Sequence, residues 1–388
     1  MREVYIAGVG QVPVTRRTET LGRHLGAAAI RAALADADCE RPGALYVGNM
    51  MSGILSDQQQ LGALIADAAG LRGVEAATTE AACASGAAAL RWGVMAVASG
   101  MHRVVVVCGL ERMTHASRER TTAALATASD WVAEGGRGES FISLNARLMA
   151  AYMDAYSATA VDFAPFSLVA HHNACGNPNA LFHKVVDLDT YLGSRMLVAP
   201  VRLFDASPTC DGAAAVVLVD AELAREAARA GRPLVRVAAS AAATDALALA
   251  DRASLLRLDA VIASTRAAYD QASIGPAEVD LFELHDAYTI ITVLSLEGAG
   301  FAPPGEGTRL GAEGAIRPGG KVPIATRGGL KGRGHPVGAT GVYQVVEAYE
   351  QLTGRAGANQ LPTATVAMTQ NVGGTGATVV THVLVREG

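Results

Sequence analysis

This chain of 388 residues has few aromatic side chains and no closely spaced pair of cysteines. Phe, Trp and Tyr make up only 5% of the sequence, whereas Ala and Gly are abundant, and this composition favours helices packed closely on sheets. The cysteines are odd in number and none belongs to a CxxC pair, which argues against a disulfide framework and against a cysteine zinc site. We therefore expect reduced thiols and a cytoplasmic protein. These thiols are Cys39, Cys83, Cys108, Cys175 and Cys210.

Long apolar runs and clusters of basic residues are also missing. No stretch is long enough to span a bilayer, and the first residues lack the apolar core of a signal peptide. The formal net charge of −5 and the absence of a Lys/Arg run disfavour nucleic-acid binding. The glycine-rich loop at residues 370–376 lacks the Lys and the spacing of a Walker loop. These absences predict no membrane partner, no nucleic-acid partner and no nucleotide hydrolysis.

Short β-branched runs alternate with Ala-rich helical stretches along most of the chain. This alternation predicts an α/β protein with a mostly parallel sheet covered by helices. The expected strands lie at residues 4–9, 44–48, 103–108, 279–284, 363–369 and 377–385. The expected helices lie at residues 21–37, 56–69, 85–99, 253–272 and 338–352.

The later part of the chain repeats the plan of the earlier part. The turn and helix that follow Cys83 are matched by those that follow His335, and the strand ending at 47–49 is matched by the one ending at 284–286. We interpret this as two similar halves, residues 1–230 and 231–388, although a coincidental rhythm explains the pattern equally well. Residues 111–200 interrupt the rhythm with a polar, irregular stretch, and an insertion of that length is usually functional.

Cys83 is the strongest candidate for a nucleophile. Small residues flank it, so the chain can turn sharply into the helix expected at residues 85–99. The free N–H groups and the positive dipole end of that helix would favour the thiolate, and we therefore expect a thiol pKa below the ordinary value. A lone buried cysteine more often serves as a small hydrophobic residue, and the local sequence makes the two interpretations about equal.

Two histidines and a glycine loop could complete a site around that thiol. His335 lies among turn-forming residues, where core packing does not explain it, and it is suited to take a proton from a thiol and return it. His285 follows an expected strand, at the edge where α/β sheets present ligands, but it could equally be a structural histidine. The loop at residues 370–376 can bring backbone N–H groups against a carbonyl oxygen.

Five blocks of the sequence, in order, resemble the signature blocks of the thiolase superfamily. The blocks are EAACASG at 80–86, LFDASPTCDGAAA at 203–215, LHDAY at 284–288, GHPVGATG at 334–341 and QNVGGTG at 370–376. The resemblance covers essentially the whole chain and is strongest toward the archaeal acetoacetyl-CoA thiolases and the sterol carrier protein-type thiolases.

The resemblance implies a fold and an activity. The fold would be a five-layer αβαβα thiolase fold of two duplicated βαβαβ halves, with a coenzyme A-binding loop domain inserted at about residues 111–200. The activity would be that of an acyl-CoA C-acyltransferase of the acetyl-CoA acetyltransferase type, which makes or cleaves a 3-ketoacyl-CoA. Coenzyme A would be a substrate or product, with no metal or other cofactor, and the protein would be a homodimer that functions in lipid metabolism.

The resemblance also implies roles for single residues. Cys83 matches the acylated nucleophile, and His335 matches the base that activates it. His285 stands where other thiolases have Asn, and with His335 it would bind the substrate carbonyl oxygen. The backbone N–H groups of Cys83 and Gly373 match the oxyanion hole of the acyl-enzyme.

One departure from the family pattern concerns the acid/base for the α-carbon. Most thiolases carry a second cysteine for this step where the present chain has Asn371, and sterol carrier protein-type enzymes carry it where the chain has Ala287. Neither thiol is present. Each tyrosine nearby is, taken singly, more typical of ordinary packing. The remaining candidates for this proton transfer are His285, His335, Tyr288, Tyr343 and Asn371.

Two other functions stay open at this point. The first is a thiolase-fold aldolase, a lyase that cleaves a β-hydroxyacyl-CoA with Tyr288 or Tyr343 supplying the proton steps. The second is a non-catalytic subunit, since some thiolase-like chains work beside a small OB-fold, zinc-binding partner protein. An intact Cys83 with both histidines argues against the non-catalytic subunit.

Two further expectations concern binding surfaces. The insertion should supply the cations that hold the phosphates of coenzyme A, and it offers Arg147, His183, Lys184 and Arg195. The homodimer should form through the sheet of the first half, with residues 104–107 close to the partner.

Overall fold

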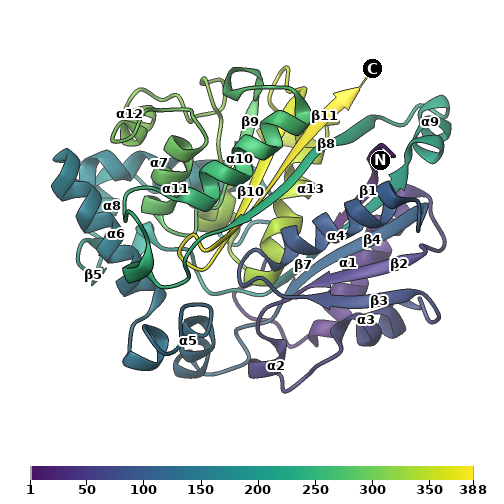
Figure 1. Cartoon of the computed structure of the whole chain (residues 1–388), viewed down its shortest axis with the longest axis horizontal. Coiled ribbons are helices and arrows are strands. Elements are labelled where there is room, and N and C mark those ends of the chain that lie inside the picture. The colour runs from purple at the N-terminus through teal and green to yellow at the C-terminus, as the bar shows by residue number, and fades with distance from the viewer. Residues whose placement is uncertain (1, 388) are drawn as a thin grey trace.

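The computed structural model describes residues 2–387 and contains one nine-stranded sheet that runs through the whole molecule (Figure 1). The N-terminal half supplies β1 (Val4–Gln11), β2 (Ala44–Gly48), β3 (Glu75–Thr79), β4 (Val104–Glu111) and β7 (Gly212–Asp220). The C-terminal half supplies β8 (Leu234–Thr244), β9 (Leu281–Glu283), β10 (Val366–Gly373) and β11 (Thr378–Glu387). The strand order is β3-β2-β4-β7-β1-β8-β11-β10-β9, so the halves meet where β1 pairs with β8.

The sheet is mixed, and the expectation of a mostly parallel sheet is wrong. β2 runs parallel to β3 and β4, and β9 runs parallel to β10, whereas the other five neighbouring pairs are antiparallel. β10 and β11 form a hairpin, and β7 returns beside β4 after the long insertion rather than through a single crossover helix. Strand direction depends on such connections, which the alternation of strands and helices does not specify.

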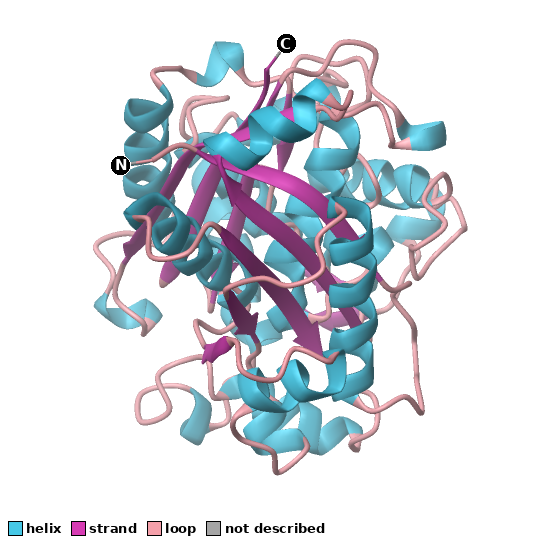
Figure 2. Cartoon of the chain, turned by 90° about the vertical axis from the view of Figure 1, so that its right-hand side faces the viewer, coloured by secondary structure: helices cyan, strands magenta, loops and turns pink. Residues whose placement is uncertain are grey.

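Helices form three layers around and between the two halves of the sheet (Figure 2). α1 (Gly22–Ala37) and α3 (Leu61–Ala69) cover the outer face of the N-terminal half. α10 (Asp259–Ala272) and α11 (Thr289–Gly298) cover the outer face of the C-terminal half. α4 (Ser85–Ser99) and α13 (Thr340–Leu352) lie between the halves. The layer order is αβαβα, which confirms the expected five-layer fold.

Burial on both faces explains the composition of the central elements. β4 and β7 are continuous apolar runs rather than alternating ones because helices cover both of their faces. α13 is buried along nearly its whole length for the same reason. Among the short helices, α2 (Ser52–Leu55) contacts α5, α9 (Ala221–Arg229) packs on β1, and α12 (Gly307–Ala312) packs on α7. Among the helices of residues 2–387, none combines the length and the apolar character that crossing a membrane requires.

The insertion between β4 and β7 is mainly helical, and the expectation of an irregular stretch is wrong. It contains α5 (Arg118–Ala126), α6 (Phe141–Tyr156), α7 (Ala160–Ala174), α8 (Leu188–Leu192) and a small hairpin of β5 (Met196–Val198) and β6 (Val201–Arg202). Capping boxes start α6 at Ser140 and α7 at Thr159. Apolar side chains of α6 and α7 join the core of the C-terminal half. The polar residues that suggested loops lie at the end of α7 and just after it.

The next features are the predicted boundary between the two halves and the edge strand of the N-terminal half. The predicted division at residues 230/231 falls between α9 and β8, and the independence of the two halves stays a prediction. The expectation that residues 104–107 lie near a dimer partner is wrong, because β4 is interior to the sheet and Val105, Val106 and Val107 are fully buried. The edge strand of this half is β3, and it has exposed side chains.

α4 and α13 begin side by side, with glycines where their backbones touch. A Cβ on Gly86 would stand 2.8 Å from the carbonyl oxygen of Gly338, and a Cβ on Gly341 would stand 2.8 Å from the Cβ of Ala87. Distances this short leave no room for a side chain. The first turns of the two helices therefore meet backbone to backbone, and the turns that precede them lie next to each other.

Gly86→Ala should separate these two turns. The added methyl group has a backbone carbonyl in its path, so we expect a loss of about 1–3 kcal/mol in the free energy of unfolding. Chemical denaturation measures this loss. Gly22→Ala is the matched control, because a Cβ there meets its nearest neighbour, Leu110, at an ordinary 3.5 Å. Equal stabilities of the two variants would contradict this account of the helix contact.

Candidate active site

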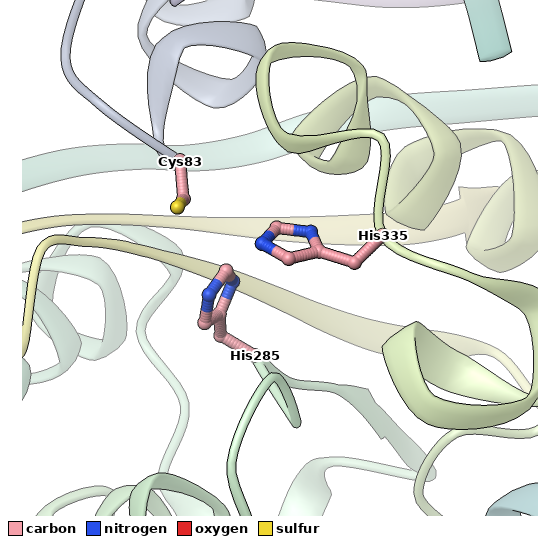
Figure 3. A group of neighbouring side chains, drawn as sticks. All are labelled: Cys83, His285 and His335. Atoms are coloured by element: carbon pink, nitrogen blue, oxygen red, sulfur yellow. The ribbon is translucent and has the colours of Figure 1, made fainter. Parts of the chain in front are cut away.

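Cys83, His285 and His335 meet at the junction of the two halves (Figure 3). Cys83 lies in the turn before α4, His285 follows β9, and His335 lies in the turn before α13. One sulfur and two ring nitrogens from these residues lie within 4.8 Å of one another. The side chains are 8%, 2% and 6% exposed in that order. The three candidates that the sequence placed in separate blocks are thus brought together in one buried cluster.

A tight, strained turn presents the sulfur. Ala82 has a φ of 51°, in the left-handed region that residues other than glycine rarely adopt. The Oγ of Ser85 accepts a hydrogen bond from the N–H of Ala81 at 2.9 Å and donates one to the carbonyl of Ala82 at 2.5 Å. These bonds hold the strained turn, which the small residues around Cys83 allow.

Burial, and after it the carboxyl group of Glu111, raise the pKa of the Cys83 thiol to about 12, while the N–H groups of Cys83 and Gly374 oppose the shift. The expected lowering of this pKa at a helix start is therefore wrong for the resting protein. A few N–H groups do not replace the water that a thiolate loses on burial. The resting nucleophile is a thiol that must pass its proton to a neighbour as it reacts.

His335 is placed to receive that proton. Its Nδ1 lies 2.7 Å from the Oγ1 of Thr340, and that hydroxyl lies 3.2 Å from the carbonyl oxygen of Pro336. The hydroxyl donates its single proton to the carbonyl and so accepts from the Nδ1–H of His335. Nε2 keeps its lone pair and faces the cluster (Figure 3). Burial, then the nearby His285 and Arg333, lower the pKa of His335 well below its ordinary value, so the ring is neutral at rest.

His285 is held by a residue of β10. The side-chain amide nitrogen of Asn371 lies 2.9 Å from the Nδ1 of His285. Burial lowers the pKa of His285 to about 3, with smaller contributions from Lys331 and Arg333. Asn371, a candidate for proton transfer from the sequence, therefore contacts His285 directly.

The chain after β10 brings a backbone N–H group near the sulfur. The N–H of Gly374 acts on the Cys83 thiol, and Gly374 lines the cavity beside it. A Cβ on Gly373 would stand 2.5 Å from the carbonyl oxygen of Ala81, so Gly373 packs against the turn. Gly374 is therefore a further candidate for the oxyanion-hole donor, and the assignment of Gly373 stays a prediction.

The two tyrosine candidates have different surroundings. Tyr288 lines the cavity that contains Cys83, and burial, then the charge of Cys83, raise the pKa of its phenol. Tyr343 is fully buried in α13, and its hydroxyl donates to the carbonyl of Val12 at 2.6 Å. Tyr343 does not line the cavity, so its hydroxyl is no longer a candidate for proton transfer there.

The cavity at the sulfur is small and mostly apolar. It measures about 80 Å³. Beyond the three candidates, Gly374 and Tyr288, its lining consists of Met113, Leu125, Phe141, Asn145, Ser207, Pro208, Thr209, Ala287, Ile291 and Val337. Five of them, Ser207, Pro208, Thr209, Ala287 and Val337, belong to the blocks noted in the sequence. The other five lie outside every block, so the sequence did not point to them.

A larger cavity of about 720 Å³ adjoins the small one. The two share Met113, Leu125, Phe141, Ser207, Pro208, Thr209 and Tyr288. Arg16, Arg118 and Arg195 line the larger cavity, so a cationic approach leads to the sulfur. Of the four cations expected from the sequence, only Arg195 lies there.

The other three expected cations line neither of these cavities, and their role in binding coenzyme A stays a prediction. Arg147 pairs with Glu139 at 3.8 Å on the surface of α6. His183 and Lys184 line neither cavity. Arg147 lies on α6, whereas His183 and Lys184 lie in the loop between α7 and α8. Arg16 and Arg118 were missed because one precedes the insertion and the other carries no sequence signal.

Glu111, at the end of β4, ties the two halves together beneath the sulfur. Its carboxyl group accepts hydrogen bonds from the N–H groups of Met50 at 3.0 Å, Met51 at 3.3 Å and Gly338 at 3.1 Å. It also accepts one from the side chain of Asn49 at 2.9 Å. Burial raises the pKa of Glu111 to about 7 despite these donors. The residue thus anchors the turn of His335 to the strand beside Cys83.

The cysteine and the two histidines also have the residue types and spacing of a metal site. Within residues 2–387 this is the one cluster of its kind. The prediction that no metal takes part remains a prediction.

Family comparisons match both halves of the chain. The thiolase N-terminal domain matches residues 4–222, and the thiolase C-terminal domain-like family matches residues 241–386. The chain belongs to the thiolase family. It is 42% identical over its full length to an acetyl-CoA acetyltransferase of Methanothermobacter thermautotrophicus, with 100% of both chains covered. It is 37% identical to one of Methanocaldococcus jannaschii, with 99% of both chains covered.

A solved structure shares the fold more distantly. The Ltp2–ChsH2(DUF35) aldolase superimposes with a TM-score of 0.85 at 23% identity, covering 99% of this chain and 98% of that one. At that identity the likeness establishes the fold alone. The full-length relatives are acyltransferases by name, and the present thiolase is accordingly a thiolase-type acyltransferase.

Alkylation of Cys83 by iodoacetamide should be slow at neutral pH and should accelerate as the pH rises toward 9 and above. A pKa raised to about 12 leaves little thiolate near pH 7, and each step up in pH increases that fraction. Peptide mass spectrometry measures the rate, with the exposed Cys175 as the internal control. Cys83 reacting faster than Cys175 at pH 7 would contradict the raised pKa.

Proposed function

We propose that this thiolase is an acyl-CoA C-acyltransferase that carries a small acyl group, such as acetyl, on Cys83 and makes or cleaves a 3-ketoacyl-CoA. The observation that carries the proposal is the cluster of Cys83, His285 and His335 at the base of a small apolar cavity. The names of the full-length relatives support the acetyl group.

The first half-reaction follows from the positions of the groups. The proton of the Cys83 thiol moves to Nε2 of His335, and the sulfur attacks the thioester carbonyl carbon. The bond from that carbon to the sulfur of coenzyme A breaks, and the departing thiolate takes the proton from His335. The N–H groups of Cys83 and Gly374, which act on the sulfur in the resting site, would hold the carbonyl oxygen as it becomes negative.

The two cavities suit the two parts of an acyl-CoA. The small cavity of about 80 Å³ accommodates a short acyl chain between apolar side chains such as Met113 and Ile291. The larger cavity would take the pantetheine arm and nucleotide, with Arg16, Arg118 and Arg195 as partners for phosphate. Coenzyme A is thus proposed as substrate or product, with no further cofactor.

The lyase alternative is less favoured. The full-length relatives are named acetyl-CoA acetyltransferases and not lyases. Of the two tyrosines that could supply the proton steps of a lyase, Tyr288 lines the cavity, whereas the hydroxyl of Tyr343 is bonded to Val12. A small OB-fold, zinc-binding partner stays a prediction. The aldolase of similar fold is named together with a DUF35 component, and that pairing belongs to that protein. The cytoplasmic location and the role in lipid metabolism also stay predictions.

Incubation with acetyl-CoA should leave one acetyl group on Cys83, seen by intact-protein and peptide mass spectrometry. Cys83→Ala should form no adduct, and His335→Ala should acylate about 10²–10⁴-fold more slowly because the general base is gone. His285→Ala should reduce acetoacetyl-CoA cleavage more than acylation. Tyr343→Phe is the control, since its hydroxyl faces away from the cavity, and it should keep both activities. An adduct on another cysteine would refute the assignment.

The homodimer is proposed to form along β3 and α4. β3 is an edge strand with exposed side chains at Glu75, Ala77 and Thr78. α4 packs against β3 and exposes Trp92 and Met95, which lie one turn apart at 53% and 37% exposure. An unpaired edge beside large apolar side chains favours symmetric pairing of two copies.

Light scattering should give the mass of a dimer at micromolar concentration. Trp92→Arg should shift the protein toward the monomer, because a charge would be buried in the contact. Trp131→Arg is the matched control, since Trp131 is 54% exposed but lies in the insertion, away from β3. A wild-type monomer, or loss of the dimer in the control alone, would count against this surface.

A further inference from the structure

Asn371 is hydrogen-bonded to His285, and the half-reaction above makes no use of this bond. It lies in β10 with 1% of its side chain exposed, and its amide nitrogen stands 2.9 Å from the Nδ1 of His285. Its amide oxygen is buried and has no hydrogen-bond partner within residues 2–387. That oxygen lies beside Gly341 at the start of α13, where a Cβ would stand 2.6 Å from it. The contact with His285 is thus the one hydrogen bond of this side chain in the described structure.

The direction of this bond decides where the proton of His285 resides. The amide nitrogen of Asn371 can only donate, so the Nδ1 of His285 must accept. A neutral imidazole carries one proton, which is then on Nε2. His335 has the opposite arrangement, because Thr340 accepts from its Nδ1–H and leaves Nε2 with a lone pair. The two rings, 5.1 Å apart between centroids, are therefore a donor and a base.

We propose that Asn371 is a positioning residue that holds His285 in the Nε2–H tautomer, so that His285 donates a hydrogen bond to the substrate oxygen and does not remove the α-proton. The inference rests on the proposed acyltransferase function and deepens it. It assigns the α-carbon step of this chain, which lacks the second cysteine, to His335.

In the second half-reaction a single base, His335, accounts for every proton transfer. After acylation His335 has returned its proton to the departing coenzyme A thiolate and is neutral again. In the condensing direction, Nε2 of His335 takes a proton from the α-carbon of a second acyl-CoA, and the electron pair moves onto its thioester oxygen. The Nε2–H of His285 holds that oxygen. The carbanion attacks the acyl carbon on Cys83, the carbon–sulfur bond breaks, and the Cys83 thiolate takes the proton from His335.

The tautomer can be read directly by long-range ¹H–¹⁵N correlation spectra of the ¹⁵N-histidine-labelled full chain. The His285 signals are assigned by their loss in His285→Asn. The wild type should show the Nε2–H pattern for His285. In Asn371→Asp the carboxylate can only accept, so Nδ1 of His285 should become protonated. A wild-type spectrum with the proton on Nδ1 would overturn the proposal, whatever the activity and whether or not Asn371→Asp folds.

A kinetic test compares two variants of His285, one of which keeps a hydrogen-bond donor but has no basic nitrogen. His285→Ala removes one donor to the developing enolate oxygen and should slow acetoacetyl-CoA cleavage by about 10²–10³-fold. His285→Asn keeps an N–H donor and should recover at least tenfold of that loss. Equal losses in the two variants would overturn the proposal, because a proton-removing His285 cannot be replaced by Asn. Failure of the proposed function is distinguishable, since it would appear as no acetyl adduct on Cys83 while the tautomer remained as stated.

Discussion

The backbone contact between the first turns of α4 and α13 decides how Cys83 and His335 lie relative to each other. Gly86 and Gly341 allow the two helices to touch without intervening side chains. Each helix starts from a turn that carries one reactive group, so the same contact brings Cys83 of one half against His335 of the other. Glu111 reinforces the arrangement because its carboxyl group bonds the loop after β2 and Gly338 together.

Burial at this junction has an electrostatic consequence for the chemistry. Removing water raises the pKa of the Cys83 thiol and lowers the pKa of both imidazoles, so the resting site is neutral rather than an ion pair of thiolate and imidazolium. Proton transfer to His335 then accompanies attack on the thioester. A neutral resting thiol is also a weak target for adventitious electrophiles, since the thiolate is the reactive form.

Hydrogen-bond direction separates the two histidines, which have almost the same surroundings. Both rings are buried and neutral, and both lie within reach of the sulfur. Thr340 accepts from one ring and Asn371 donates to the other, so the lone pair faces the cluster in His335 and the N–H faces it in His285. A chain that lacks the second cysteine of other thiolases can in this way divide carbonyl binding and proton transfer between two residues of the same type.

Local sequence determined many of the elements outside the insertion, the five ordered blocks and the reactive residues. Turns rich in small residues before helices, and a nucleophile or base within them, are properties of neighbouring residues. The local sequence predicted Cys83, His285 and His335, although not the sign of the Cys83 pKa shift. Tertiary structure alone decided that sign, the antiparallel pairing of β7 and the place of Gly374 near the sulfur. It also decided that Tyr343 points away from the cavity and that Arg16 and Arg118 line the larger one. Each depends on burial or on the direction in which a side chain points, and both are set by segments far apart in the chain.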